Sequence, residues 1–183
     1  MAPALRPPET FTTARLTARP ITVADAPAVF AAYANDPEVT RYLTWPVCTK
    51  AEELHPFLAT QEKTWRGENA GRFAWLLSRR DDGAVLGSIG VDIDGWKICC
   101  GYVLGRAHWG RGYMTEALQW VVDWGLAQPA IHRVWAFCDL ENPASGRVMV
   151  KAGMTHEGLL RRWHVAPNLG PAPRDCDVYA KVR

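Results

Sequence analysis

The amino-acid sequence predicts one α/β domain of the α+β kind, built on a mixed central sheet of about seven strands with about four helices. The chain has 183 residues, of which 48% are hydrophobic and 22% charged, as is typical of a soluble globular domain. Segments with the two-residue period of a strand are interspersed with segments of helical period. No internal repeat or second composition regime is present, so residues 1–183 are assigned to a single domain.

The N-terminal part contains a clear helix start. Residues 1–13 hold three prolines and few apolar side chains, so we expect a loose arm followed by a first strand. Thr22 and Asp25 then stand at the spacing of a capping box, which predicts that a helix begins here. Two prolines in the segment 35–46 should end that helix and keep the following residues in a loop.

The rest of the chain alternates between strands and helices. Turn signals at residues 81–83 and 94–95 indicate hairpins between the central strands. The predicted strands are at residues 16–21, 73–77, 85–91, 98–104, 134–138, 155–163 and 177–182, and the predicted helices are at residues 25–34, 50–65, 114–126 and 144–152.

Composition and patterning exclude several classes of protein. The formal net charge is only +2 and the basic residues are scattered, which argues against nucleic-acid binding. No run of apolar residues is long enough for a membrane span and no secretory signal is recognisable, so a cytoplasmic monomer or small oligomer, such as a homodimer, is expected. The five cysteines form no CxxC pair, which argues against a disulfide framework and against a metal site.

The most informative stretch follows the predicted strand at 98–104. Gly110 and Gly112 stand in a loop directly before a long amphipathic helix. Glycines let backbone amides approach a ligand, and a helix N-terminus adds partial positive charge, so the amides of residues 109–115 are expected to bind phosphate. Arg106, His108 and Arg111 add cations around the loop. The alternative is an ordinary tight turn; a Rossmann fingerprint and a P-loop are both absent.

These residues resemble a known family. The segment WGRGYMTEAL is similar to the pyrophosphate-binding loop of GNAT acetyltransferases, whose pattern is Q/R-x-x-G-x-G/A, although Ala107 occupies the leading position. The segment NPASGRVMVKAGM resembles the RimJ/RimL-type pattern N-x-x-S-x-R-V-L-x-K-x-G-F, and Asp175 and Tyr179 keep the spacing of the closing strand. The resemblance extends from residue 15 to residue 182 and implies the GNAT fold, with a sheet splayed at its centre.

The resemblance implies acetyl-CoA as co-substrate and a primary amine, either a peptide N-terminus or a small amine, as acceptor. The residues expected to contact coenzyme A are Val103 and Leu104 through their backbone, together with Trp109, Gly110, Arg111, Gly112, Tyr113, Met114, Thr115, Asn142 and Arg147. Many relatives place a tyrosine proton donor where Met149 stands, so Ser145 is the candidate catalytic donor and Asn142 its catalytic partner in positioning the coenzyme. Alternatively, Ser145 caps a helix and Asn142 forms a turn.

The general base is not identified. Cys99 replaces a glutamate that is frequent in relatives, and its thiol either helps to take the proton or packs as a small apolar group. Asp92, Asp94, His164 or ordered water are the other candidates, and no base is needed if the amine arrives neutral. Trp45, Tyr42 and Asp175 are expected to line the acceptor site, between the 35–46 loop and the loop from Trp163 to Arg174. The missing tyrosine and glutamate also leave open a catalytically silent acyl-CoA-binding module, or an interaction domain with a degenerate loop.

Overall fold

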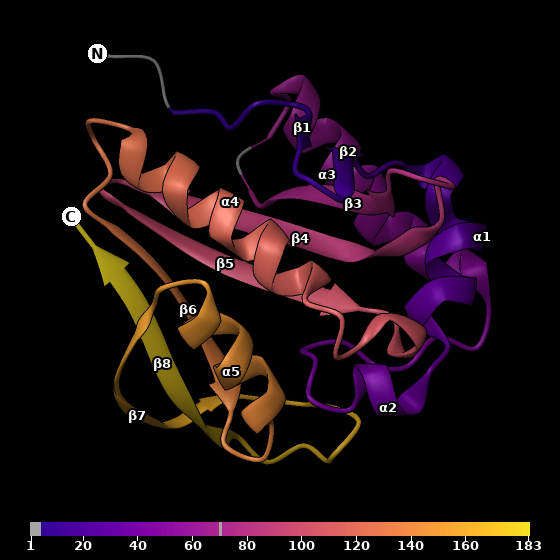
Figure 1. Ribbon diagram of the computed structural model, residues 1–183. Coiled ribbons are helices and arrows are strands. Elements are labelled where there is room, and N and C mark those ends of the chain that lie inside the picture. Colours follow the sequence, from indigo (N-terminus) through magenta and orange to yellow (C-terminus); the bar gives the residue numbers. More distant parts are fainter. Residues whose placement is uncertain (1–4, 70) are drawn as a thin grey trace.

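The computed structural model describes residues 5–69 and 71–183, and these residues build one twisted sheet between two layers of helices (Figure 1). Within that part of the chain the sheet has eight strands in the order β1-β2-β3-β4-β5-β6-β8-β7. All neighbouring strands are antiparallel except β5 and β6, which are parallel. The strands are β1 Phe11–Thr12, β2 Leu16–Pro20, β3 Phe73–Arg79, β4 Val85–Asp94, β5 Lys97–Leu104, β6 Arg133–Asp139, β7 Thr155–His164 and β8 Arg174–Val182.

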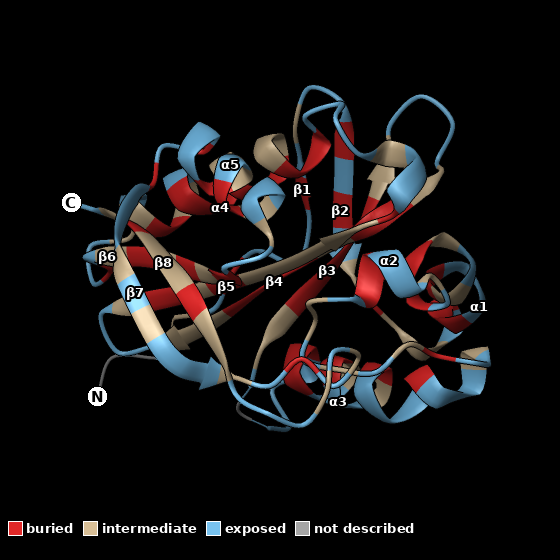
Figure 2. Ribbon diagram, turned by 90° about the horizontal axis from the view of Figure 1, so that it is seen from below, coloured by how far each residue is buried: buried red, intermediate tan, exposed pale blue. Residues whose placement is uncertain are grey.

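The helices divide between the two faces of the sheet. The α-helices are α1 Ala26–Val29, α2 Pro37–Thr40, α3 His55–Arg66, α4 Tyr113–Ala127 and α5 Pro143–Lys151. Figure 2 shows α4 and α5 on one face and α1, α2 and α3 on the other. Among the helices of the described residues, none combines the length and the apolar character needed to cross a bilayer.

The structure confirms the predicted mixed α/β sheet and differs from the sequence analysis near the N-terminus. Part of the expected loose arm is ordered: Phe11 lies in the additional strand β1, and its ring stacks on Trp120 of α4 at 3.8 Å between centroids. The indole N–H of Trp75 also donates to the carbonyl oxygens of Pro8 and Glu9, at 3.1 Å each. These long-range contacts, rather than local pattern, order the segment; residues 1–4 lie outside the described residues.

The first two helices are also less regular than predicted. The segment predicted as one helix over 25–34 consists of a 3₁₀ turn, the α1 helix and a π-helical turn at Phe30–Ala34. Pro37, expected to keep the chain in a loop, instead opens α2, because proline at the first helical position loses no helical hydrogen bond. The capping box at Thr22 and Asp25 is present as predicted.

The larger hydrophobic core lies between α4 and the sheet. Leu118, Val121 and Val122 of α4 are completely buried, as are Leu86 and Ile98 on the strands beneath them. Full burial of an aliphatic side chain contributes about 1.5–3 kcal/mol, so these contacts hold α4 firmly on the sheet. A second, smaller core fills the opposite face under α1 and α3.

The two central strands separate after a short pairing. The parallel register joins β5 to β6 at Lys97–Cys99 only, with Cys99 opposite Trp135. Beyond this point β5 stays paired with β4 as far as Leu104, and β6 stays paired with β8 as far as Asp139. The facing edges of β5 and β6 therefore diverge, which confirms the splay that the family resemblance implies.

Candidate active site

The loop between β5 and α4 presents free backbone amides at the open end of the splay. Gly110 and Gly112 have φ values of 73° and 78°, in the left-handed region that glycine adopts without strain. Gly112 is the N-cap of α4. Within residues 5–69 and 71–183, no oxygen accepts a hydrogen bond from the amides of residues 110–115. These amides, together with the helix dipole, form a site suited to a phosphate group.

A salt bridge from the N-terminal part of the chain holds this loop in place. Arg15 donates through Nε to Glu116 Oε2 at 2.7 Å and through Nη1 to the carbonyl of Arg111 at 2.9 Å. Its guanidinium also lies 4.6 Å from the centre of the Tyr113 ring. On the other side, the Trp109 indole donates to the carbonyl of Leu104 at 2.7 Å. The sequence analysis did not identify Arg15.

The three cations predicted around the loop differ in their environment. Arg106 forms an ion pair with Asp36 at the start of α2, with 2.9 Å between Nε and Oδ2. Burial and the nearby charges of Arg111 and Arg79 lower the pKa of His108, so its imidazole is neutral at physiological pH. The exposed Arg111 is therefore the cation of this cluster best suited to contact an anionic ligand.

Two hydroxyl groups bridge the splay. The Oγ of Ser145 on α5 lies 2.8 Å from the hydroxyl of Tyr102 on β5, which also donates to the Ser145 carbonyl at 3.1 Å. Burial raises the pKa of Tyr102, so the phenol stays protonated. Asn142 Oδ1 accepts from the Ser145 amide at 3.3 Å, which makes Asn142 rather than Ser145 the cap of α5. Met149, at the position of the frequent tyrosine, is completely buried.

The other residues predicted to contact coenzyme A are not all brought together. Val103 and Leu104 lie on the part of β5 that has lost its pairing with β6. Tyr113 and Met114 have buried side chains, so the loop offers their amides alone. Arg147 lies elsewhere: it lines a cleft of about 360 Å³ between α5 and β8, and Ser145 does not line that cleft. The structure therefore separates the side chains of Arg147 and Ser145.

The candidate bases occupy unfavourable positions. Burial raises the pKa of the Cys99 thiol to about 11, so the thiol is protonated at neutral pH. Asp92 accepts from Arg72 Nε at 2.9 Å and from its Nη2 at 2.5 Å, which commits this carboxylate to an ion pair. Asp94 pairs with Lys97 at the β4–β5 turn, at the end of the hairpin remote from the splay.

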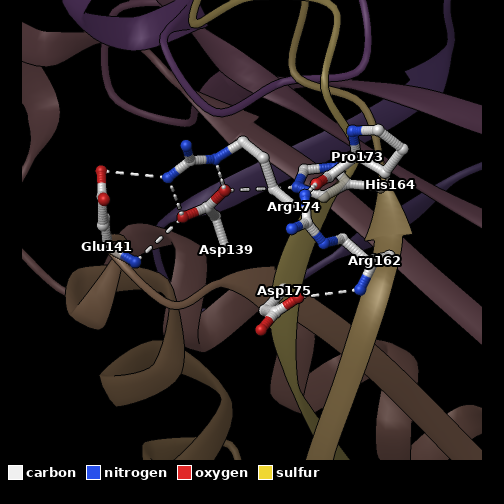
Figure 3. A network of polar contacts seen from close by, with 7 residues as sticks. All are labelled: Asp139, Glu141, Arg162, His164, Pro173, Arg174 and Asp175. Carbon is white, nitrogen blue, oxygen red and sulfur yellow. Dashed lines mark hydrogen bonds and ion pairs between the residues drawn. The ribbon is translucent and has the colours of Figure 1, made fainter.

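The last candidate base, His164, belongs to a buried polar network at the end of β6 (Figure 3). Asp139 Oδ2 accepts from Arg174 Nε at 2.5 Å and lies 3.4 Å from His164 Nε2. Burial favours the neutral acid, but the hydrogen bonds from Arg174, from the Glu141 amide and from His164 outweigh it and lower the pKa of Asp139. His164 is thereby held against a carboxylate.

Asp175, predicted to line the acceptor site, lies next to this network (Figure 3). Its Oδ1 accepts from the Arg162 amide at 2.8 Å, and Arg162 has the positive φ of 50° that is rare for a residue other than glycine. Asp175 lines a second cleft, of about 320 Å³, together with Arg162 and Arg174.

The two loops predicted to bound the acceptor site contact each other directly. Asn168 Nδ2 donates to the carbonyls of Thr40 and Trp45, at 2.8 and 3.0 Å, and Oδ1 accepts from the Val47 amide at 2.9 Å. Trp45 is half-buried against the second core. The Arg41 guanidinium lies 5.5 Å from the Tyr42 ring centre, so a cation of the protein itself already covers the face of this ring.

The fold and this site define an acetyltransferase of the GNAT class. The family model of the acetyltransferase (GNAT) domain matches residues 15–155, and the chain belongs to this family. It is 32% identical over 174 residues to the uncharacterized N-acetyltransferase p20 of Bacillus licheniformis, covering 93% of each chain. It is also similar to the crystal structure of the acetyltransferase (GNAT family) from Bacillus anthracis, with a TM-score of 0.78, 26% identity and coverage of 94% of this chain and 98% of that one.

A more distant structural neighbour is RimL, a ribosomal alpha-N-protein acetyltransferase in complex with coenzyme A. It matches with a TM-score of 0.80 and 21% identity, covering 95% of this chain and 98% of that one. At this identity the likeness concerns the fold.

Proposed function

We propose that this acetyltransferase transfers the acetyl group of acetyl-CoA to a primary amine by direct attack in a ternary complex. The observation that carries the proposal is the set of free amides at residues 110–115, at the open end of the splay. Their number and the adjacent Arg111 suit a diphosphate such as that of coenzyme A. The unpaired edge of β5 leads from these amides toward the two hydroxyls of Tyr102 and Ser145.

Each step of the transfer has a candidate group. The neutral amine nitrogen attacks the acetyl carbon, a C–N bond forms, and the C–S bond breaks as a thiolate leaves. The nitrogen loses one proton to solvent water and the sulfur takes one up, so the products are an amide and the thiol of coenzyme A. Backbone amides near Val103 and Leu104, on the unpaired edge, are the candidate donors to the carbonyl oxygen on which negative charge develops. Ser145 Oγ is the candidate donor of a proton or hydrogen bond to the thiolate, and the Tyr102 hydroxyl, 2.8 Å from Oγ, holds it in position.

The acceptor ranked first is the α-amine of a peptide N-terminus, as in the RimJ/RimL-type branch. The Cys99 thiol is protonated and Asp92 is paired with Arg72, so neither is suited to remove a proton from an ammonium group. An α-amine has a pKa near 8, against about 10.4 for lysine, and more of it is neutral at physiological pH. A small amine is the second choice.

Two conservative substitutions test the roles of the hydroxyls. Ser145→Ala should lower kcat by about 10²-fold and leave the Kd of acetyl-CoA unchanged, because the hydroxyl acts only as the thiolate leaves. Tyr102→Phe should lower kcat less, since it removes only the partner of Ser145. Thiol release with a free N-terminal peptide measures kcat, and calorimetric titration measures Kd. Full kcat in Ser145→Ala would reject the catalytic role.

The second candidate is an acyl-CoA-binding module without turnover. The protonated Cys99 and the ion-paired Asp92 favour it, because the site then holds no strong base. Binding of acetyl-CoA without thiol release, across peptides with free N-termini, lysine peptides and polyamines, would establish this alternative and reject the proposed transfer.

A further inference from the structure

The sheet face opposite α4 and α5 carries a fixed cation where β5 and β6 separate. Gly90 of β4 and Gly101 of β5 are register partners, and the side chain of Arg72 lies across both. A Cβ on Gly90 would lie 2.9 Å from Arg72 Cδ, and a Cβ on Gly101 would lie 2.4 Å from Arg72 Nη1. The two glycines therefore form the trough that this arginine fills.

Asp92 fixes the orientation of the guanidinium and leaves one end of it available. Both Nε and Nη2 of Arg72 donate to the same carboxylate oxygen, Oδ2 of Asp92. Among the residues that the structure describes, no acceptor is paired with Nη1, and the Arg72 side chain is 37% exposed. The free edge of a guanidinium held in this way can bind a carboxylate with charge-assisted hydrogen bonds.

Nη1 lies close to the expected place of the reaction. Gly101 is two residues beyond Cys99, the last residue of β5 that pairs with β6, and two residues before Val103. Two residues of a strand span about 6.6 Å. An extended peptide advances about 3.3–3.6 Å per residue. A side chain on the first or second residue of an acceptor whose amine lies near Val103 is thus within reach of Nη1.

We propose that Arg72 determines acceptor specificity by binding a carboxylate on the first or second residue of the acceptor. The preferred acceptor is then a peptide with a free N-terminus and an Asp or Glu at one of these two positions. This inference rests on the proposed acetyl transfer to an α-amine. It further specifies that the acceptor carries a negative charge next to that amine.

Two peptides that differ only in Glu or Gln at their second residue test the proposal. The wild type should acetylate the Glu peptide with a kcat/KM on the order of tenfold to a hundredfold higher, mainly through KM. Arg72→Met should abolish this preference, so that the ratio of kcat/KM for the Glu and Gln peptides falls to about one, because methionine fills the glycine trough but offers no donor to a carboxylate. Arg72→Lys should retain part of the preference.

Arg133→Met is the matched control, because Arg133 on β6 also forms an ion pair with a carboxylate of another strand, Glu157 on β7. It should retain the full preference. The role of Arg72 would be overturned if the wild type showed equal kcat/KM for the two peptides. It would also be overturned if the preference survived in Arg72→Met, including the case in which that variant loses activity equally on both peptides. Equilibrium binding of the same peptides in the presence of coenzyme A separates the two proposals: a Glu preference in binding without any acetylation would contradict the proposed transfer alone.

Discussion

Removal of the Asn168 side chain should loosen the two loops that bound the expected acceptor site. Asn168→Ala deletes three hydrogen bonds, to Thr40, Trp45 and Val47, at 2.8–3.0 Å. Each contributes about 0.5–1.5 kcal/mol net, which together lowers the free energy of unfolding by about 1.5–4.5 kcal/mol. For a chain of this size, the middle of that range corresponds to a fall in Tm of about 6–12 °C.

Thermal unfolding followed by circular dichroism measures this change. Asn168→Asp should be at least as damaging, because it places a carboxylate oxygen against the two carbonyls that now accept from Nδ2. The exposed Asn35, which lies in the first of the two loops, provides the matched control, and Asn35→Ala should leave Tm close to that of the wild type.

The functional readout separates loop position from coenzyme binding. The hydrogen bonds of the Asn168 side chain go to Thr40, Trp45 and Val47 and not to residues 110–115, so the Kd of acetyl-CoA should stay constant in Asn168→Ala while KM for the acceptor rises. If Asn168→Ala melts at the same temperature as Asn35→Ala, the side chain does not hold the loops together, and the reasoning is refuted.

Two further predictions concern the phosphate loop and the buried network. Gly112→Val should weaken acetyl-CoA binding at least tenfold in calorimetric titration, because the φ of 78° at this position disfavours a residue with a Cβ and the amides of the loop would shift. The fold should be retained, since the strain is only about 1–2 kcal/mol and an added Cβ would approach only Arg15 Nη2, at 3.5 Å. Unchanged affinity would contradict the phosphate role. Asp139→Asn should lower the free energy of unfolding by about 1–3 kcal/mol at pH 7, because the charge-assisted hydrogen bonds to Arg174 are lost while Arg174 keeps its ion pair with Glu141. The pKa of Asp139 is lowered in the folded state, so its stabilisation is complete above the unfolded value of about 3.9 and is lost as the pH falls further. Denaturant unfolding should show the two proteins converging below pH 4, and a constant difference down to pH 2 would contradict this assignment.

The regular elements and the glycine loop could be predicted because their signals are local. The apolar face of α4, the hairpins and the left-handed glycines all follow from neighbouring residues. In contrast, β1 has two residues and no period of its own, and it depends on Phe11 stacking against Trp120, far away in the sequence. Pattern alone contains no information about such a contact.

The residues around the site that the sequence analysis missed share this cause. Tyr102, Arg72 and Asn168 acquire their roles through partners 20 or more positions away: Ser145, Asp92 and the loop of Val47. A polar hydroxyl within the apolar strand GYVL was the available signal for Tyr102. The separation of Ser145 and Arg147 on opposite sides of α5 was also available, because positions two apart on a helix point about 200° apart.

The brevity of the parallel pairing between β5 and β6 divides the sheet into two antiparallel units. One unit contains β1 to β5 and the other contains β6, β8 and β7. Among the described residues, the register at Lys97–Cys99 and the adjoining hydrogen bond from the His132 amide to the Trp96 carbonyl join their main chains. Cooperative opening in proteins tends to follow such boundaries. Beyond Cys99 the seam can therefore widen with the loss of few main-chain hydrogen bonds, while the core under α4, which contains buried residues of both units, keeps them together; a ligand in the seam would add a second connection between the two units.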